Sequence, residues 1–104
     1  MRKGVLELCI LSIIGKEDVY ASDIIQHLKS SDLIVVEGTL YPLLTRLKNA
    51  GLLEYRWQES KSGPPRKYYR LTNQGEKMRE TLKADWYKLQ GQVNQLLESK
   101  QENQ

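Results

Sequence analysis

The sequence contains one cysteine, one histidine and no phenylalanine among its 104 residues. Cys9 has no second cysteine to bond with, so an internal disulfide is excluded, and this usage is typical of a reducing compartment. His27 lacks a partner cysteine or a spaced set of carboxylates, which disfavours a metal site and predicts a surface position on a helix. We therefore expect no metal and no cofactor, with Cys9 packed as a small apolar side chain.

Long hydrophobic runs are missing as well. The most apolar segment, from Val5 to Ile14, is interrupted by Glu7 and Ser12 and falls short of the roughly 18 residues that a membrane span needs. No cleavage site of small residues follows this segment, so it does not resemble a signal peptide. The expectation is a cytoplasmic protein with no membrane partner.

The sequence also lacks the motifs on which catalysis depends. It has no glycine loop that would cradle a phosphate, no plausible catalytic triad, and no metal-ligand spacing. We therefore expect a binding protein rather than an enzyme.

Acidic residues are scarce in one stretch, although the net charge of the whole chain is only +3. Residues 56–70 contain a single acid, Glu59, and five basic residues: Arg56, Lys61, Arg66, Lys67 and Arg70. Basic residues concentrated in this way are the electrostatic footprint of a polyanion such as nucleic acid. A hairpin kept soluble by its charge produces the same pattern, so the clustering alone leaves both interpretations open.

The first part of the chain has the apolar spacing of helices. Residues 3–14 are apolar nearly all round, so a helix there needs cover on more than one side, and Gly15 is its expected end. Residues 21–31 predict a second helix with one apolar stripe, capped by Ser22 or a neighbour. The β-branched run at residues 33–36 predicts a brief strand or an extended link.

A third helix is predicted to begin close to Gly38 or Thr39 and to end at Gly51. Pro42 is acceptable near a helix start, where backbone N–H groups have no intrahelical acceptor. Leucines at the i, i+3, i+4, i+7 spacing form its apolar stripe: Leu40, Leu43, Leu44 and Leu47. The opposite face carries Thr39, Tyr41, Thr45, Arg46, Lys48 and Asn49.

Alternation of apolar and polar residues then replaces the helical spacing. Residues 53–58 have the period of a half-buried strand, with one side formed by Leu53, Tyr55 and Trp57. After a turn with two prolines, residues 66–71 alternate in the same way, placing Lys67, Tyr69 and Leu71 on one side and Arg66, Tyr68 and Arg70 on the other. The two segments predict a hairpin with a basic tip.

A long helix is predicted from Thr72 or Asn73, both good caps, to about Ser99. Its apolar positions have a near-heptad spacing that suits packing against an identical helix: Met78, Leu82, Trp86, Leu89, Val93 and Leu96. We assign these residues to a dimer interface, together with Leu8 on the first helix, which needs additional cover. The polar end of the chain is expected to be frayed and solvated.

Three helices followed by a basic hairpin describe a winged helix-turn-helix, so the expected fold is mainly α with a small β-hairpin. The expected domains are a DNA-binding domain at residues 1–72 and a dimerisation helix with its polar tail at residues 73–104. In this fold the third helix enters the major groove, and the hairpin, or wing, reaches an adjacent backbone or minor groove. The expected helix contacts are Thr39, Tyr41, Thr45, Arg46 and Lys48, and the expected wing contacts are Lys61, Arg66, Lys67 and Tyr68.

Some of these residues have a second interpretation. Lys48 lies near a helix C-terminus, where a lysine also complements the helix dipole, so it is assigned to a phosphate only. Arg70 fits pairing with Glu54 or Glu59 across the strands equally well. Of the adjacent tyrosines 68 and 69, one should pack under the wing and the other should present its hydroxyl near a phosphate.

Two segments, "GTLYPLLTRLKNAGLLEYRW" (residues 38–57) and "GPPRKYYRLTNQGE" (residues 63–76), resemble the PadR family of bacterial transcriptional regulators. The resemblance covers about the whole chain, and the pairing of the two motifs is far more specific than a generic winged helix. It implies a homodimer that represses genes by binding double-stranded DNA at a palindromic operator. It also implies that a C-terminal helix supplies much of the dimer contact, and with one such helix the chain resembles the short branch of the family.

The resemblance further implies a ligand site. Some short members of the family bind flat aromatic compounds between their subunits beside a tryptophan on the last helix, and Trp86 stands where that residue would. Trp86, Leu82 and Leu89 therefore fit two interpretations, plain dimer core or the wall of a cavity for a small aromatic effector. An alternative for the whole chain is a winged-helix protein-interaction module, whose basic hairpin binds an acidic protein and which has no ligand response.

Overall fold

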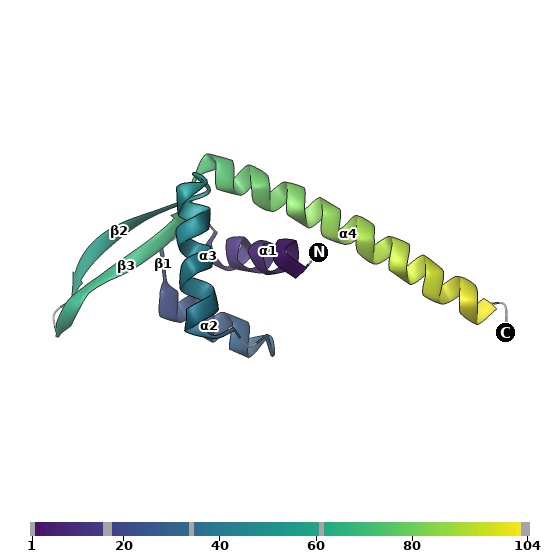
Figure 1. Cartoon of the computed structure of the whole chain (residues 1–104), viewed down its shortest axis with the longest axis horizontal. Coiled ribbons are helices and arrows are strands. Elements are labelled where there is room, and N and C mark those ends of the chain that lie inside the picture. Colours follow the sequence, from purple (N-terminus) through teal and green to yellow (C-terminus); the bar gives the residue numbers. More distant parts are fainter. Residues whose placement is uncertain (1, 16–17, 34, 61, 103–104) are drawn as a thin grey trace.

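The computed structural model describes residues 2–15, 18–33, 35–60 and 62–102. These residues form four helices and a three-stranded antiparallel sheet (Figure 1). In chain order the elements are α1 (Arg2–Ile14), β1 (Val19–Tyr20), α2 (Ala21–Ser30), α3 (Glu37–Asn49), β2 (Leu53–Ser60), β3 (Gly63–Leu71) and α4 (Asn73–Glu102). The predicted fold class, mainly α with a basic hairpin and a long last helix, is confirmed.

The hydrophobic core lies between α1, α2, α3 and the base of the sheet. Its buried side chains are Ile10, Leu11, Ile14, Ile24, Leu28, Leu40, Leu44, Leu47, Leu53, Tyr69 and Leu71. As predicted, α1 is covered on more than one side, because it contacts α2, β3 and α4. Gly15 follows α1 with a φ of 58°, a conformation that glycine adopts without strain. Cys9 packs half-buried against the same core.

Two helix starts differ from the prediction. α2 begins after Tyr20 without a side-chain cap, so Ser22 is not its N-cap. α3 begins at Glu37, which places Pro42 in the second turn rather than among the first residues, whose N–H groups lack an acceptor. The proline therefore removes one intrahelical hydrogen bond from the exposed side of the helix. Residues 33, 35 and 36 belong to no strand and link α2 to α3.

The sheet has the order β1-β3-β2, and the hairpin of β2 and β3 is the predicted wing. In its register Trp57 lies opposite Lys67. The sequence does not predict β1, because a strand of two residues carries no periodicity. β1 pairs with Tyr68 and Tyr69, and it brings the start of α2 against the wing.

Of the two predicted caps for the last helix, Thr72 is the one used. Its hydroxyl accepts a hydrogen bond from the backbone N–H of Gly75 at 3.0 Å and donates one to the carbonyl of Gly51 at 2.6 Å. These bonds join the start of α4 to the turn that ends α3, where Gly51 has a φ of 80°. α4 then packs along α1 and continues beyond it (Figure 1).

The substitution Gly75→Ala is expected to destabilise the fold by about 3 kcal/mol. A Cβ atom at residue 75 would lie 2.0 Å from the backbone carbonyl oxygen of Leu52, which cannot move aside as a flexible side chain does. Gly91→Ala on the same helix is the matched control, since its added Cβ has nothing within 4 Å. Urea unfolding measures both variants, and equal free energies of unfolding would contradict this close approach.

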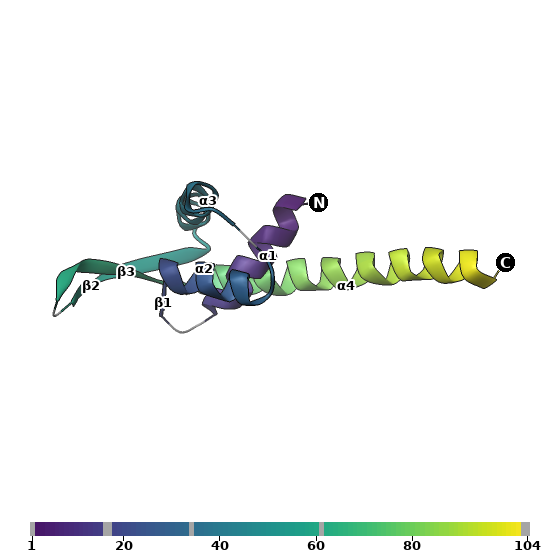
Figure 2. The ribbon, with the colours of Figure 1, turned by 90° about the horizontal axis from the view of Figure 1, so that it is seen from below.

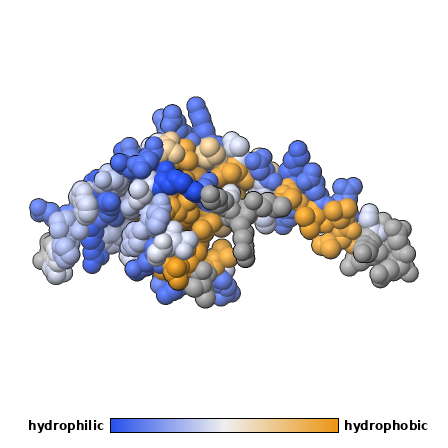
Figure 3. Space-filling model, viewed as in Figure 1, coloured by the Kyte–Doolittle hydropathy of each residue, from blue (hydrophilic) through white to orange (hydrophobic). Residues whose placement is uncertain are grey.

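The wing and α4 project in opposite directions from the helical core, and the molecule measures 63 × 27 × 20 Å (Figure 1). Figure 2 shows α3 standing clear of the layer that contains the wing, α2 and α4. In Figure 3 a hydrophobic strip follows the lower side of α4 past the core. Among the described residues, none of the helices has the length and apolar character to cross a membrane.

Candidate nucleic-acid interface

The five residues predicted to contact DNA from the third helix all have exposed side chains on α3: Thr39, Tyr41, Thr45, Arg46 and Lys48. The buried leucines of α3 fix this orientation by holding the opposite side of the helix to the core. Helical spacing places Tyr41, Thr45 and Lys48 on the flank toward the wing and Arg46 on the flank toward α1. The five residues therefore do not point in one direction.

Arg46 is engaged within the chain. Its guanidinium donates a hydrogen bond to the Glu7 carboxylate of α1 and forms an ion pair with it. Because both side chains are partly exposed, this pair contributes little to stability. It does offset the charge of the cation, so a contact between Arg46 and a base would compete with Glu7. The Thr45 hydroxyl has no such competing partner among the residues that the structure describes.

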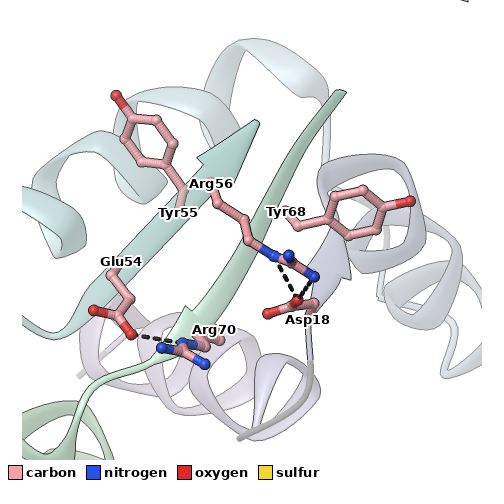
Figure 4. Close-up of a pocket in the computed structure, with 6 residues that line it drawn as sticks. All are labelled: Asp18, Glu54, Tyr55, Arg56, Tyr68 and Arg70. Atoms are coloured by element: carbon pink, nitrogen blue, oxygen red, sulfur yellow. Dashed lines mark hydrogen bonds and ion pairs between the residues drawn. The ribbon is translucent and has the colours of Figure 1, made fainter. Parts of the chain in front are cut away.

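The basic residues of the wing are divided between the two faces of the sheet. On the outer face Arg56 forms an ion pair with Asp18, and Arg70 forms one with Glu54 at 2.6 Å (Figure 4). Of the two acids predicted for Arg70, the structure selects Glu54. These residues line a hollow of about 510 Å³, and the ring of Tyr55 points away from the two ion pairs (Figure 4). Two of the clustered arginines are therefore neutralised within the chain.

Lys48, Arg66 and Lys67 form no ion pair within the described part of the chain. Each lies over an aromatic ring instead. The Nζ atoms of Lys48 and Lys67 are 5.5 and 4.2 Å from the ring centroid of Tyr55, and the Arg66 guanidinium is 4.8 Å from that of Tyr20. A ring positions a cation without neutralising it, so these three charges remain available. Lys61, predicted to act with them, lies outside the described residues.

A groove of about 400 Å³ separates the wing from the helices. Arg66 and Lys67 line it from the wing, Tyr41 from α3, and Ala21 and Ser22 from the start of α2. Because α2 has no side-chain cap, its first backbone N–H groups are open and favour an anion. Two cations, open N–H groups and the polar flank of α3 thus face one groove, which suits the phosphate backbone of a nucleic acid.

The two adjacent tyrosines of the wing have different environments. Tyr69 is only 4% exposed and packs under the wing against the core. Tyr68 is half-buried on the outer face, where its ring stacks on that of Tyr20 with the centroids 4.2 Å apart. Tyr69 is therefore the packed tyrosine, and the structure places Tyr68 beside the outer ion pairs rather than in the groove with Lys67.

Burial raises the pKa of the Tyr69 hydroxyl above its ordinary value of 10.0, and nearby Tyr41 and Tyr55 add to the rise. The unfolded chain therefore loses this proton before the folded chain does. The free energy of unfolding should be unaffected by this group below about pH 10 and should fall as pH rises through the folded pKa. Urea unfolding in alkaline buffers measures the fall. Tyr69→Phe should reduce it, and an equal reduction by the exposed control Tyr87→Phe would contradict the assignment to Tyr69.

The groove also contains residues that the sequence pattern does not assign to DNA. Ala21 and Ser22 face it because β1 anchors the start of α2 beside the wing. Trp57 is predicted on a half-buried side of β2, yet only Leu53 on that side is buried, because the strand continues beyond the helices. In the sequence, the signal for such a contact is a tryptophan on a strand of the basic hairpin.

The predicted dimer residues lie on one side of α4. Leu82, Trp86 and Leu89 of α4 line an apolar cleft of about 180 Å³ with Val5 and Leu8 of α1. Toward the C-terminal end the same side becomes more exposed, reaching 45% at Val93 and 72% at Leu96. Met78, near the start of α4, is also exposed. Figure 3 shows hydrophobic surface on the lower side of the free length of α4.

A helix-turn-helix formed by α2 and α3, followed by the basic hairpin of β2 and β3, defines the winged helix-turn-helix class of domain. The sequence profile of the transcriptional regulator PadR-like family matches residues 10–81. The chain belongs to this family, and the predicted resemblance is confirmed.

Solved structures of related proteins have the same fold. A PadR-like transcription factor from Bacteroides fragilis is 61% identical, with 92% of this chain and 93% of that chain covered and a TM-score of 0.81. A PadR-like transcriptional regulator from Bacillus cereus is 42% identical, with 93% and 95% covered and a TM-score of 0.80. PadR from Bacillus subtilis, solved in complex with operator DNA, is 26% identical, with 84% and 47% covered and a TM-score of 0.69.

Proposed function

We propose that the chain is a homodimeric, sequence-specific DNA-binding regulator that represses transcription. The observation that carries this proposal is the distribution of charge around the groove. Lys48, Arg66 and Lys67 keep their charge and lie at the groove or on its flank, whereas Arg56 and Arg70 are neutralised on the outer face. The structure of Bacillus subtilis PadR on operator DNA supports a duplex as the partner.

In this proposal residues 1–72 contact DNA and residues 73–104 join two copies. Thr39, Tyr41, Thr45 and Arg46 would enter the major groove, while Lys48 and the wing would hold flanking phosphates. A two-fold dimer then reads two half-sites about one helical turn apart, or a multiple of it. This arrangement corresponds to a palindromic operator.

A gel-shift assay with the DNA upstream of the protein's own gene tests this function, and a transcription reporter on the same DNA tests repression. Within a library of operator variants, Thr45→Ala should change which sequence is preferred, because Thr45 faces outward and has no competing partner among the described residues. Lys67→Gln should weaken binding to all operator sequences by the same factor. The same preference profile for both variants would contradict this division of roles. Binding to an acidic polypeptide but not to DNA would favour the protein-interaction module instead.

A small-molecule site at the dimer interface is a second part of the proposal, supported by the apolar cleft beside Trp86. With about 180 Å³ in one copy, the cleft is smaller than the roughly 300 Å³ at which ligand pockets begin, so a second copy would have to complete it. Planar aromatic compounds should quench tryptophan fluorescence, and Trp86→Ala should abolish the quenching while Trp57→Ala should not. If none of a broad panel of such compounds quenches the fluorescence, the interpretation of Trp86 as part of a plain dimer core is favoured.

A further inference from the structure

The inner face of the wing, the side toward α3, presents aromatic surface that the described chain does not cover. Trp57 is 62% exposed and Tyr55 is 37% exposed, and the two rings meet edge to face with centroids 6.4 Å apart. Single exposed apolar residues are common on protein surfaces, so exposure alone assigns no role to Trp57. The residues that surround Trp57 do indicate a role for it.

Cations that form no ion pair with the other described residues converge on these rings from two elements. The Nζ atom of Lys67 on β3 is 4.2 Å from the centroid of Tyr55 and 5.4 Å from that of Trp57, while the Nζ atom of Lys48 on α3 is 5.5 Å from that of Tyr55. Trp57 on β2 and Lys67 on β3 are directly opposite in the strand register, so the indole ring and the ammonium group lie next to each other on the wing. The two rings therefore restrict Lys67 without neutralising it.

Trp57 also faces the groove from which a nucleic acid would be contacted. It lines that groove with Lys67 on the wing, Tyr41 on α3 and Ser22 at the start of α2. A DNA strand lying there presents an apolar edge of deoxyribose beside every phosphate. An exposed indole ring next to an unpaired ammonium group matches this alternation of apolar and anionic surface. The carboxylates of an acidic polypeptide would engage Lys67 but leave the indole uncovered.

We propose that Trp57 is a DNA-contacting residue whose ring packs against deoxyribose in the strand between α3 and the wing, while Tyr55 and Trp57 together hold Lys67 toward the adjacent phosphate. This inference rests on the proposed DNA-binding function and adds an uncharged contact to it. Because sugar and phosphate are the same at every base pair, Trp57 contributes to affinity for all sequences.

Salt titrations separate the role of Trp57 from that of Lys67. Trp57→Ala should weaken binding to a duplex of about three helical turns by about tenfold at every salt concentration. The slope of log affinity against log salt should stay unchanged, because Lys67 keeps its closer ring contact, at 4.2 Å from the centroid of Tyr55. Lys67→Gln should instead make that slope shallower by about 0.9 for each phosphate that is no longer neutralised. Trp57→Phe, which keeps an aromatic ring, should retain most of the affinity. Because the Trp57 side chain is exposed, Trp57→Ala and Trp57→Phe should melt at the wild-type temperature.

Acrylamide quenching locates the indole directly. The chain has two tryptophans, so the difference between wild type and Trp57→Phe reports on Trp57 alone. A saturating duplex should protect Trp57 from acrylamide severalfold, and polyglutamate at the same ionic strength should not.

The inference is overturned if wild type binds the duplex while Trp57 stays as accessible as in the free protein, or if Trp57→Ala binds as tightly as wild type. Protection by polyglutamate and not by DNA also overturns it. Failure of wild type to bind any duplex at low salt would overturn the proposed function itself, which is a distinguishable result.

Discussion

Reversing the charge of Arg66 and Lys67 together, as Arg66→Glu with Lys67→Glu, is expected to weaken binding to every duplex by on the order of a thousandfold. In a dimer the change removes four cations, each worth about 1 kcal/mol beside a phosphate, and introduces four like charges. The weakening should not depend on sequence, because these side chains lie on the wing, across the groove from the exposed face of α3. Their substitution should leave the fold intact, since neither takes part in an ion pair among the described residues.

Fluorescence anisotropy over a range of salt concentrations measures this effect. The slope of log affinity against log salt should become shallower by about three to four units, at about 0.9 for each phosphate that is no longer neutralised. The matched control is Lys83→Glu with Lys88→Glu, which changes the net charge equally at exposed positions on α4. An equal weakening in the control would mean that net charge, and not the wing, determines affinity.

Placing charges on the free length of α4, as Val93→Asp with Leu96→Asp, is expected to convert a dimer into monomers and to reduce operator affinity by about a hundredfold or more. Both side chains are exposed in a single copy, at 45% and 72%, so their replacement removes nothing from the core. Within a dimer the same positions would bury unpaired carboxylates, which is strongly unfavourable. A monomer also cannot hold the second half-site, whose binding in a dimer is an intramolecular event.

Sedimentation equilibrium measures the dimerisation, and anisotropy on the operator measures the affinity. Asn94→Asp with Gln95→Asp is the matched control, because these residues lie on the other side of the same stretch of α4. The control should remain dimeric. A wild-type monomer at micromolar concentration, or a Val93 and Leu96 variant that still dimerises, would contradict the proposed interface.

The helical part of the fold could be predicted from the sequence, because the spacing of the leucines indicates which side of a helix is buried. Leu40, Leu44 and Leu47 are buried as their spacing predicts, and the exposed face of α3 follows from that. Thr72 and Gly51 fix the ends of their helices through local chemistry, a cap and a positive φ. These features involve residues near one another in the sequence.

The features that the sequence does not predict depend on residues distant in the chain. Arg46 pairs with Glu7 and Arg56 with Asp18, and no spacing rule indicates either ion pair. Alternation places Trp57 on the correct side of its strand but does not say where the covering helices end, so its exposure was not predictable. Which cations stay free, and therefore where a polyanion would lie, becomes apparent only from the tertiary structure.

Native mass spectrometry of the protein mixed with duplex DNA from upstream of its own gene tests the central claim most directly. If two copies dimerise through α4 and each places its groove on the duplex, we expect a single complex that contains two protein chains per duplex. One chain per duplex, or no complex at low ionic strength, would contradict the account.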